Sequence, residues 1–283
     1  MAEVLTREEM IRRIVEVGRR DHRIAGLVDY GSNGGLALDQ WSDIDVAVFL
    51  HDTQFEAFVL ALSEWLAQLG EPLLLINNVN SVRSFTRAVF DTEQLPLRVD
   101  IVYYYLGEMS TALHWPQEPK ADKVNVLYDA TNGELTSCMR QLPNSDLHPS
   151  DLQETFELTA RYFWYFLLES VCKLQRGDHW YTSYFFHNAV VPRLIYLIRL
   201  HEGAISRWFV NPRLKGLEQA LSPEIMTRLN TCLPDTASPK GMTDAIKNTA
   251  TLATEVCRNV AARHGYVWPE ALAERVEKAL AQC

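Results

Sequence analysis

A glycine turn followed by two closely spaced carboxylates constrains the fold of this chain more than any other sequence feature. Gly31-Ser32 ends one apolar segment, and Asp43-Ile44-Asp45 opens the next, which continues as an apolar run to residue 50. Side chains alternate across a strand, so Asp43 and Asp45 share one face while Ile44 occupies the other. The pattern therefore predicts two strands joined by a turn, with both carboxylates at the start of the second strand.

These residue types point to metal-bound phosphate chemistry. Two carboxylates about 6–7 Å apart along one strand repel each other unless a cation lies between them. Mg²⁺ takes one or two carboxylates and completes its shell with water and phosphate oxygens. Glycines let backbone N–H groups approach an anion closely. The combination predicts phosphoryl or nucleotidyl transfer; the alternative is a pair of acidic residues on a solvated strand edge.

Gly-Ser, a spacer of about ten residues and Asp-x-Asp among apolar residues resembles the signature of the DNA polymerase β-like nucleotidyltransferase superfamily. That family has a third carboxylate on a neighbouring strand, and Asp100, within Arg98-Val99-Asp100-Ile101-Val102, matches it. The resemblance implies that Asp43, Asp45 and Asp100 are catalytic and bind metal. Asp100 is either a ligand of a second Mg²⁺ or the base that deprotonates an acceptor hydroxyl; antibiotic-modifying members favour the base.

The same resemblance implies a triphosphate site around the glycine turn. Gly31 and Ser32 are expected to contact the β- and γ-phosphates of a nucleoside triphosphate, although Gly31 could simply form the turn. Lys173 is a candidate from the C-terminal half, with a solvated lysine at a helix end as the alternative. Arg83 and Arg87 either face the nucleotide or are exposed strand positions.

The chain has 283 residues and changes character near its middle. We expect an α/β (α+β) fold class, with a small mixed-sheet nucleotidyltransferase domain over 1–143 and an all-helical, acceptor-binding domain over 150–283. A polar, proline-bearing run over 143–149 separates them. Strands are predicted over 24–30, 44–50, 73–76, 84–90, 97–103 and 124–128. Helices are predicted from a Thr6 capping box, from a Thr53 capping box to residue 69, and over 150–176, 179–202 with a kink or break at Pro192, 223 onward, 239–265 and 269 onward.

The helical half narrows the resemblance to the antibiotic-modifying branch. Segments 173–178 and 196–204 resemble lincosamide nucleotidyltransferases, as do 126–129 and 133–136. The tail over 261–270 resembles aminoglycoside 6-adenylyltransferases. The lincosamide enzymes often have Asp-x-Glu where this chain has Asp43-x-Asp45, which preserves the charge but departs from that subfamily.

Three residues of the helical half are candidates for binding the acceptor. Glu169 lies among apolar neighbours, where an unpaired carboxylate is costly to bury. It is expected to pair with Lys173 one turn later or with an amine on the acceptor. Tyr181 and Tyr184 belong to an aromatic cluster that is either part of a substrate pocket or part of the core.

Charge and composition restrict the partners. The net charge of −9 argues against a general nucleic-acid binder, because such proteins need a basic face for phosphates. Five cysteines without a Cys-x-x-Cys pair fit reduced thiols better than disulfides or zinc. The first residues lack a secretory signal, and no stretch is long enough to span a membrane, so a cytoplasmic location is expected.

We therefore predict Mg²⁺-dependent transfer of a nucleoside monophosphate, AMP from ATP, to a hydroxyl of a small antibiotic. A lincosamide is the first choice of acceptor and an aminoglycoside the second, and a homodimer is plausible. An interpretation of another class is a nucleotidyltransferase-like antitoxin or regulatory nucleotide-binding module. Intact Asp43, Asp45 and Asp100 argue against loss of activity, and the long helical domain argues against the shorter antitoxin form.

Overall fold

The computed structural model describes residues 5–31, 42–79, 84–92, 95–115, 120–144, 148–206, 208, 214, 216–234 and 238–281. Ser32 and Arg83, both candidates for the triphosphate site, lie outside these ranges. The chain divides into two compact units, residues 1–145 and 146–283, and each is described by itself.

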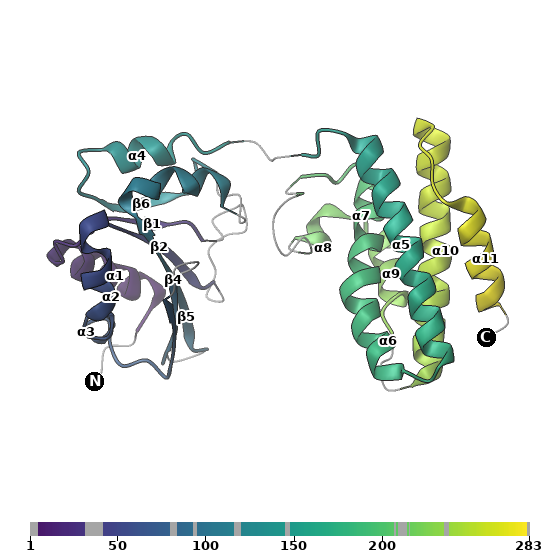
Figure 1. The fold of residues 1–283 in the computed structure, drawn as a ribbon, viewed down its shortest axis with the longest axis horizontal. Helices are drawn as coiled ribbons and strands as arrows, with labels where there is room; N and C mark the ends of the chain where they lie inside the picture. The colour runs from purple at the N-terminus through teal and green to yellow at the C-terminus, as the bar shows by residue number, and fades with distance from the viewer. Residues whose placement is uncertain are drawn as a thin grey trace. The chain divides into compact units, whose positions relative to one another are not determined.

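The first unit is built on a mixed sheet (Figure 1). The described residues form six strands in the order β3-β4-β5-β2-β1-β6. The strands are β1 (Ile24–Asp29), β2 (Ile44–Leu50), β3 (Leu74–Val79), β4 (Ser84–Phe90), β5 (Leu97–Tyr105) and β6 (Asn125–Asp129). Strands β2 and β5 run parallel, and the other neighbouring pairs are antiparallel.

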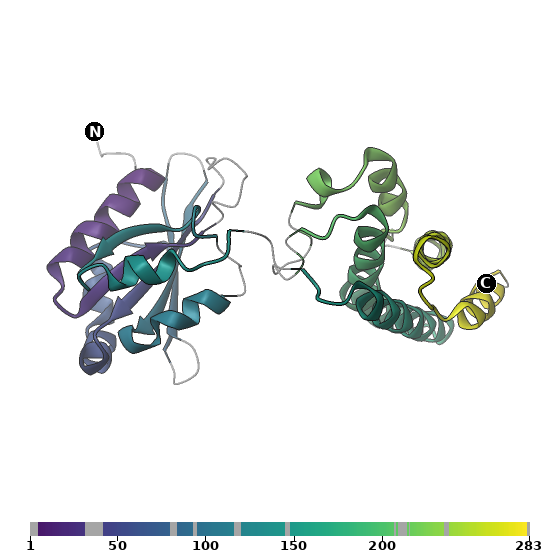
Figure 2. The ribbon, with the colours of Figure 1, turned by 90° about the horizontal axis from the view of Figure 1, so that it is seen from above.

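Helices cover both faces of this sheet (Figures 1 and 2). One face packs against α1 (Arg7–Arg20), α2 (Phe55–Leu60) and α3 (Leu62–Ala67), and the other against the 3₁₀ segment η2 (Leu106–His114) and α4 (Glu134–Met139). Alternation along the strands produces the two cores: Leu27 and Val46 face α1–α3, whereas Val28 and Phe49 face η2 and α4. Asp45 lies on the same face of β2 as Phe49, so the carboxylates belong to the η2 and α4 face.

Two predicted helix starts are wrong. The segment predicted as one helix from a Thr53 cap is a 3₁₀ turn, η1 (Asp52–Gln54), followed by α2 and α3, and no side chain caps η1 or α2. Asp52 instead accepts a hydrogen bond from the backbone N–H of Gly107 at 3.0 Å, a contact with residues far along the chain. The second helical unit starts at an Asp151 cap, which accepts from Glu154 N, rather than at Ser150.

The second unit is all-helical, so the predicted fold class is confirmed (Figure 1). Its helices are α5 (Leu152–Gln175), α6 (His179–Phe185), the π-helical segment η3 (Phe186–Val190), α7 (Val191–Glu202), α8 (Leu217–Ala220), α9 (Pro223–Thr231), α10 (Pro239–His264) and α11 (Glu270–Leu280). The predicted interruption near Pro192 is present: the π segment ends there, and Pro192 lies in the first turn of α7. Phe156, Trp164 and Ile246 belong to one buried cluster that joins α5, α7 and α10.

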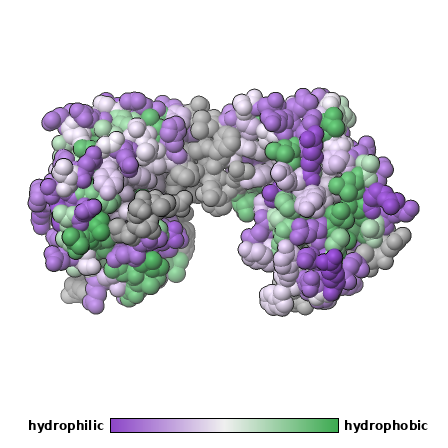
Figure 3. Space-filling model, in the orientation of Figure 1, coloured by the Kyte–Doolittle hydropathy of each residue, from purple (hydrophilic) through white to green (hydrophobic). Residues whose placement is uncertain are grey.

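The described helices include none that is both long and apolar enough to cross a membrane. On the face drawn in Figure 3, hydrophilic residues alternate with smaller hydrophobic patches in both units.

Candidate active site

The three aspartates predicted from the sequence meet at one end of the parallel strand pair. Asp45 in β2 and Asp100 in β5 are register partners on neighbouring strands, so their side chains emerge side by side on one face. Asp43 lies two residues before Asp45, immediately ahead of β2, and its negative charge acts on Asp100. The sheet thus assembles carboxylates that are more than fifty residues apart in the sequence.

Two arginines accompany these carboxylates. Arg98 Nη2 donates to Asp43 Oδ2 at 2.9 Å, and Arg87 Nε lies 3.5 Å from Asp100 Oδ2. The arginine side chains are 65% and 62% exposed, so each pair contributes little to stability and can be rearranged at small cost. Arg87 was a candidate from the sequence. Arg98 was missed, although its position two residues before Asp100 puts both on one face of β5.

The pKa of Asp100 is raised above its ordinary value. Burial is the largest cause, and the charge of Asp43 acts in the same direction, whereas Arg87 and Arg98 partly oppose the rise. Burial and a neighbouring carboxylate both disfavour the ionised form. A carboxylate with a raised pKa is a better proton acceptor, which suits the predicted role of base.

Gly31 lies directly against Asp45. A Cβ atom at Gly31 would be 3.2 Å from Asp45 Oδ2 and 3.3 Å from Asp29 Oδ1, so a side chain there would press on two carboxylates. The Gly31 N–H donates to Asp29 Oδ1 at 3.1 Å and is therefore already engaged.

Tyr30 closes the inner side of the carboxylate group. Its backbone N–H donates to the Asp45 carbonyl at 3.1 Å, and its ring packs on Trp115 at a centroid distance of 4.6 Å. Burial first, and then the charge of Asp45, raises the pKa of the Tyr30 hydroxyl. The buried rings of Tyr30 and Trp115 thus lie beside the aspartates on the face of the sheet that packs against η2.

The donor set fits a divalent cation that also binds phosphate. Within the described ranges, no group of three or more His, Cys, Asp or Glu side chains forms a complete metal site. Asp45 and Asp100 nevertheless lie side by side; burial is the main cause of the raised pKa of Asp100, and the negative charge of Asp43 adds to it. Mg²⁺ needs only one or two carboxylates when phosphate oxygens and water complete its shell. Metal binding by Asp43, Asp45 and Asp100 stays a prediction.

The candidates of the helical unit form a cluster of their own. Tyr181 Oη donates to Glu169 Oε1 at 3.2 Å, and Lys173 Nζ lies 4.8 Å from the centroid of the Tyr181 ring. Tyr184 is 70% exposed, so it is not a core residue. The structure brings Glu169, Lys173 and Tyr181 together on α5 and α6. Their roles in binding remain predictions.

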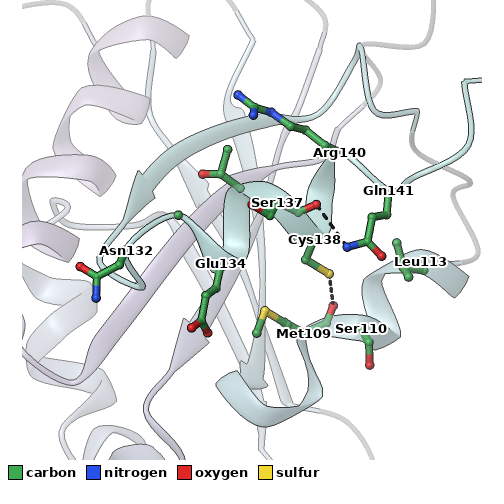
Figure 4. A pocket seen from close by; sticks show the side chains of 11 residues that line it. Met109, Ser110, Leu113, Asn132, Glu134, Ser137, Cys138, Arg140 and Gln141 are labelled. Atoms are coloured by element: carbon green, nitrogen blue, oxygen red, sulfur yellow. Dashed lines mark hydrogen bonds between the residues drawn. The ribbon is translucent and has the colours of Figure 1, made fainter.

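A separate, open cavity of about 760 Å³ lies between η2 and α4 (Figure 4). Met109, Leu113, Cys138 and Gln141 are among its lining residues, and Cys138 Sγ contacts the Met109 carbonyl at 3.6 Å. None of the three aspartates lines it, and Glu134 is its one carboxylate. We therefore place the chemistry at the aspartates, because this cavity offers no paired acidic groups.

Comparison with known proteins gives a family match over nearly the whole chain. Residues 4–283 match the family described as streptomycin adenylyltransferase. No curated protein matches. An aminoglycoside 6-adenyltransferase from Bacillus subtilis is 17% identical, with 99% of this chain and 98% of that chain covered and a TM-score of 0.44. A nucleotidyltransferase-like protein from Exiguobacterium sibiricum 255-15 is 13% identical, with 96% and 89% covered and a TM-score of 0.36.

Proposed function

This chain belongs to the streptomycin adenylyltransferase family, and from that premise we propose that it transfers the adenylyl group of ATP to a hydroxyl of an aminoglycoside. Membership of the antibiotic-modifying branch, predicted from the sequence, is confirmed, and the chain is an antibiotic adenylyltransferase. The observation that supports a working catalytic centre is the side-by-side register of Asp45 and Asp100 next to Gly31. The family match favours the enzyme over the regulatory-module alternative.

The acceptor class is the finer part of the proposal. The likeness to lincosamide enzymes rests on short segments of the helical half, whereas the family match extends over residues 4–283. We therefore place an aminoglycoside first and keep a lincosamide as the second candidate. Aminoglycosides carry several cationic groups, which fits an acidic chain with a net charge of −9.

In the proposed reaction, the acceptor hydroxyl attacks the α-phosphate of ATP, a new oxygen–phosphorus bond forms and pyrophosphate leaves. Asp100 takes the proton of that hydroxyl, a contribution of about 10²–10⁴-fold for general bases. Asp43 and Asp45 would hold Mg²⁺, which when bound neutralises charge on the phosphate oxygens. Arg98 and Arg87 offset negative charge beside the carboxylates.

The test is a turnover assay on the purified protein with ATP, Mg²⁺ and a panel of aminoglycosides, streptomycin included, and lincosamides. We expect pyrophosphate release together with an aminoglycoside whose mass has increased by one adenylyl group. Removing Mg²⁺ with EDTA should stop the reaction and adding it back should restore it. Asp45→Asn serves as the inactive control.

Two outcomes would count against the proposal. Modification of lincosamides alone would overturn the aminoglycoside assignment and leave the reaction class intact. Pyrophosphate release without any modified antibiotic in the panel would reject an antibiotic as the acceptor.

A further inference from the structure

Asp29 is a buried carboxylate that the proposed reaction does not use. It is the last residue of β1 and only 3% of its surface is exposed. An isolated carboxylate at such a position is strongly unfavourable, because it loses its hydration without replacement. Its presence therefore requires partners, and the structure provides two.

The partners of Asp29 are Arg7 and Gly31. Arg7, the first residue of α1, donates from Nη2 to Asp29 Oδ2 at 3.3 Å, and its side chain is 14% exposed. The second carboxylate oxygen, Oδ1, accepts the Gly31 N–H at 3.1 Å. The same carboxylate thus joins a buried guanidinium to the turn that lies against Asp45.

Arg7 has a second contact, on the other side of the connection between β1 and β2. Its Nε donates to the backbone carbonyl of Asp43 at 3.4 Å. The N–H donors of a guanidinium lie in one rigid plane. The bond from Nη2 to Asp29 therefore fixes the direction in which Nε can donate. One side chain therefore connects the end of β1 with the residue that opens the catalytic Asp43-Ile44-Asp45 motif.

We propose that Arg7 and Asp29 are positioning residues for nucleotidyl transfer. The pair holds Asp43 through its backbone carbonyl, and it holds Gly31, which lies against Asp45, through its N–H. This inference rests on the proposed function, because it takes Asp43 and Asp45 as the residues that hold the metal. It adds two residues outside the Gly-Ser and Asp-x-Asp motif.

Positioning and simple stabilisation make different predictions. Removing one partner of a buried ion pair leaves an uncompensated charge, whereas replacing both with apolar residues is often neutral for stability. A double substitution can therefore recover the fold while the hydrogen bonds to Asp43 and Gly31 stay lost. If the pair only stabilises the unit, activity returns together with the fold; if it positions the site, activity does not return.

The experiment compares three variants of the full chain with the wild type: Arg7→Met, Arg7→Met/Asp29→Val and the control Arg12→Met. Arg12 is on the same helix but its side chain is 55% exposed, where it pairs with Glu9 and Glu16. Thermal unfolding, kcat, both KM values and the Mg²⁺ concentration for half-maximal rate are measured.

We expect Arg7→Met to lower Tm by roughly 5–15 °C and the double variant to return within a few degrees of wild type. The kcat of the double variant should stay about 10- to 100-fold low, because small displacements of catalytic groups have effects of that size. More Mg²⁺ should be needed for half-maximal rate, and the acceptor KM should change less than about twofold. The control should match wild type within about twofold.

A double variant with wild-type kcat and wild-type Mg²⁺ requirement would overturn the positioning role and leave the proposed function standing. If the wild type modifies no acceptor, the proposed function fails, and the pair is then judged by calorimetric titration with ATP and Mg²⁺. Weaker binding to the double variant by about tenfold would support the pair, and equal affinity, or no binding to either protein, would overturn it.

Discussion

At the scale of single residues, the proposed chemistry depends on how charges are balanced around Asp100. Its carboxyl group is partly buried and senses the charge of Asp43, while the exposed Arg87 and Arg98 compensate only in part. The result is a raised pKa and hence a group that is less stable ionised than it would be in water. The destabilisation of the folded state by ionised Asp100 and the suitability of Asp100 as a base therefore both follow from the raised pKa.

The variant Asp100→Asn tests whether the raised pKa of Asp100 affects both catalysis and stability. The variant should lose about 10²–10⁴-fold in kcat, because the general base is removed. The folded state of the wild type binds the Asp100 proton more tightly than the unfolded state, so wild-type stability falls as pH rises through the interval between the ordinary and the raised pKa. The variant lacks this penalty.

We therefore expect Asp100→Asn to melt at a higher temperature than wild type at pH 7, with the difference disappearing below about pH 4. Melting curves across this pH range and pH–rate profiles of both proteins are the measurements. A variant that is less stable than wild type at pH 7 would show that ionised Asp100 does not destabilise the folded state. A variant that keeps near wild-type turnover across pH would show that Asp100 is not the base.

At the residue scale, the sequence identified the carboxylates but not their surroundings. Asp43, Asp45 and Asp100 follow from local spacing and strand alternation. Arg7 contacts Asp29 and Asp43 only because α1 packs beside the sheet, and no local pattern encodes those contacts. Such partners depend on tertiary structure, so a single sequence does not reveal them.

At the scale of elements, local sequence patterns predicted the position of most strands and helices but not which strands pair with each other. The predicted bounds 44–50 and 84–90 coincide with β2 and β4, and the Ser222 and Ser238 caps accept from Ile225 and Gly241 as their serine-proline signals suggest. The parallel pairing of β2 with β5 was not predictable, because it joins segments separated by β3 and β4. Helix α4 was missed since its six residues form too short a periodic pattern.

The start of α4 depends on a dense set of hydrogen bonds to Asp129. Its Oδ1 accepts from the N–H and the hydroxyl of Thr131 at 2.8 and 2.6 Å, and its Oδ2 accepts from Thr136 N at 3.0 Å. Burial would raise the pKa of Asp129, but the hydrogen bonds from Thr131 and Thr136 outweigh it and lower the pKa to about 2. Asp129 therefore acts as a structural cap that connects β6 to α4.

Asp129→Ala should destabilise the first unit by about 1 kcal/mol at pH 7, an N-cap-sized loss after allowance for solvent screening. Because the folded pKa is lowered, the contribution of Asp129 is present above its ordinary pKa and is lost as pH falls from about 4 towards 2. Urea unfolding of wild type and variant at pH 7 and at pH 3 measures this contribution to the free energy of unfolding. The matched control is Asp122→Ala, whose side chain is 60% exposed; equal losses in the two variants would contradict the capping role.

At the scale of the whole molecule, the chain forms two compact units, and each holds candidate functional residues. The sheet unit holds the three aspartates and the glycine turn, whereas the helical unit holds Glu169, Lys173 and the exposed tyrosines. We propose that the first unit binds nucleotide and metal and that the second recognises the acceptor. The division at 1–143 and 150–283 was predicted from the proline-bearing run and the loss of strand pattern that accompanies it, and it stays a prediction.

This division predicts that acceptor affinity and nucleotide affinity can be changed separately. Glu169 accepts a hydrogen bond from the Tyr181 hydroxyl and lies one turn before Lys173 on α5. Its carboxylate is therefore held in a defined position. An aminoglycoside ammonium group would pair with that carboxylate. Glu169→Gln should raise the acceptor KM about tenfold, equivalent to about 1.4 kcal/mol of binding, and leave ATP binding within about twofold of wild type.

The measurements are acceptor KM from steady-state rates and ATP affinity from calorimetry in the presence of Mg²⁺. Glu274→Gln is the control, since it removes an exposed carboxylate from α11 of the same unit and makes the net charge less negative by the same amount. If both variants raise the acceptor KM alike, the effect comes from overall charge rather than from Glu169. If Glu169→Gln weakens ATP binding as much as acceptor binding, the two units do not divide the substrates, and Lys173 and Glu169 belong to the nucleotide site instead.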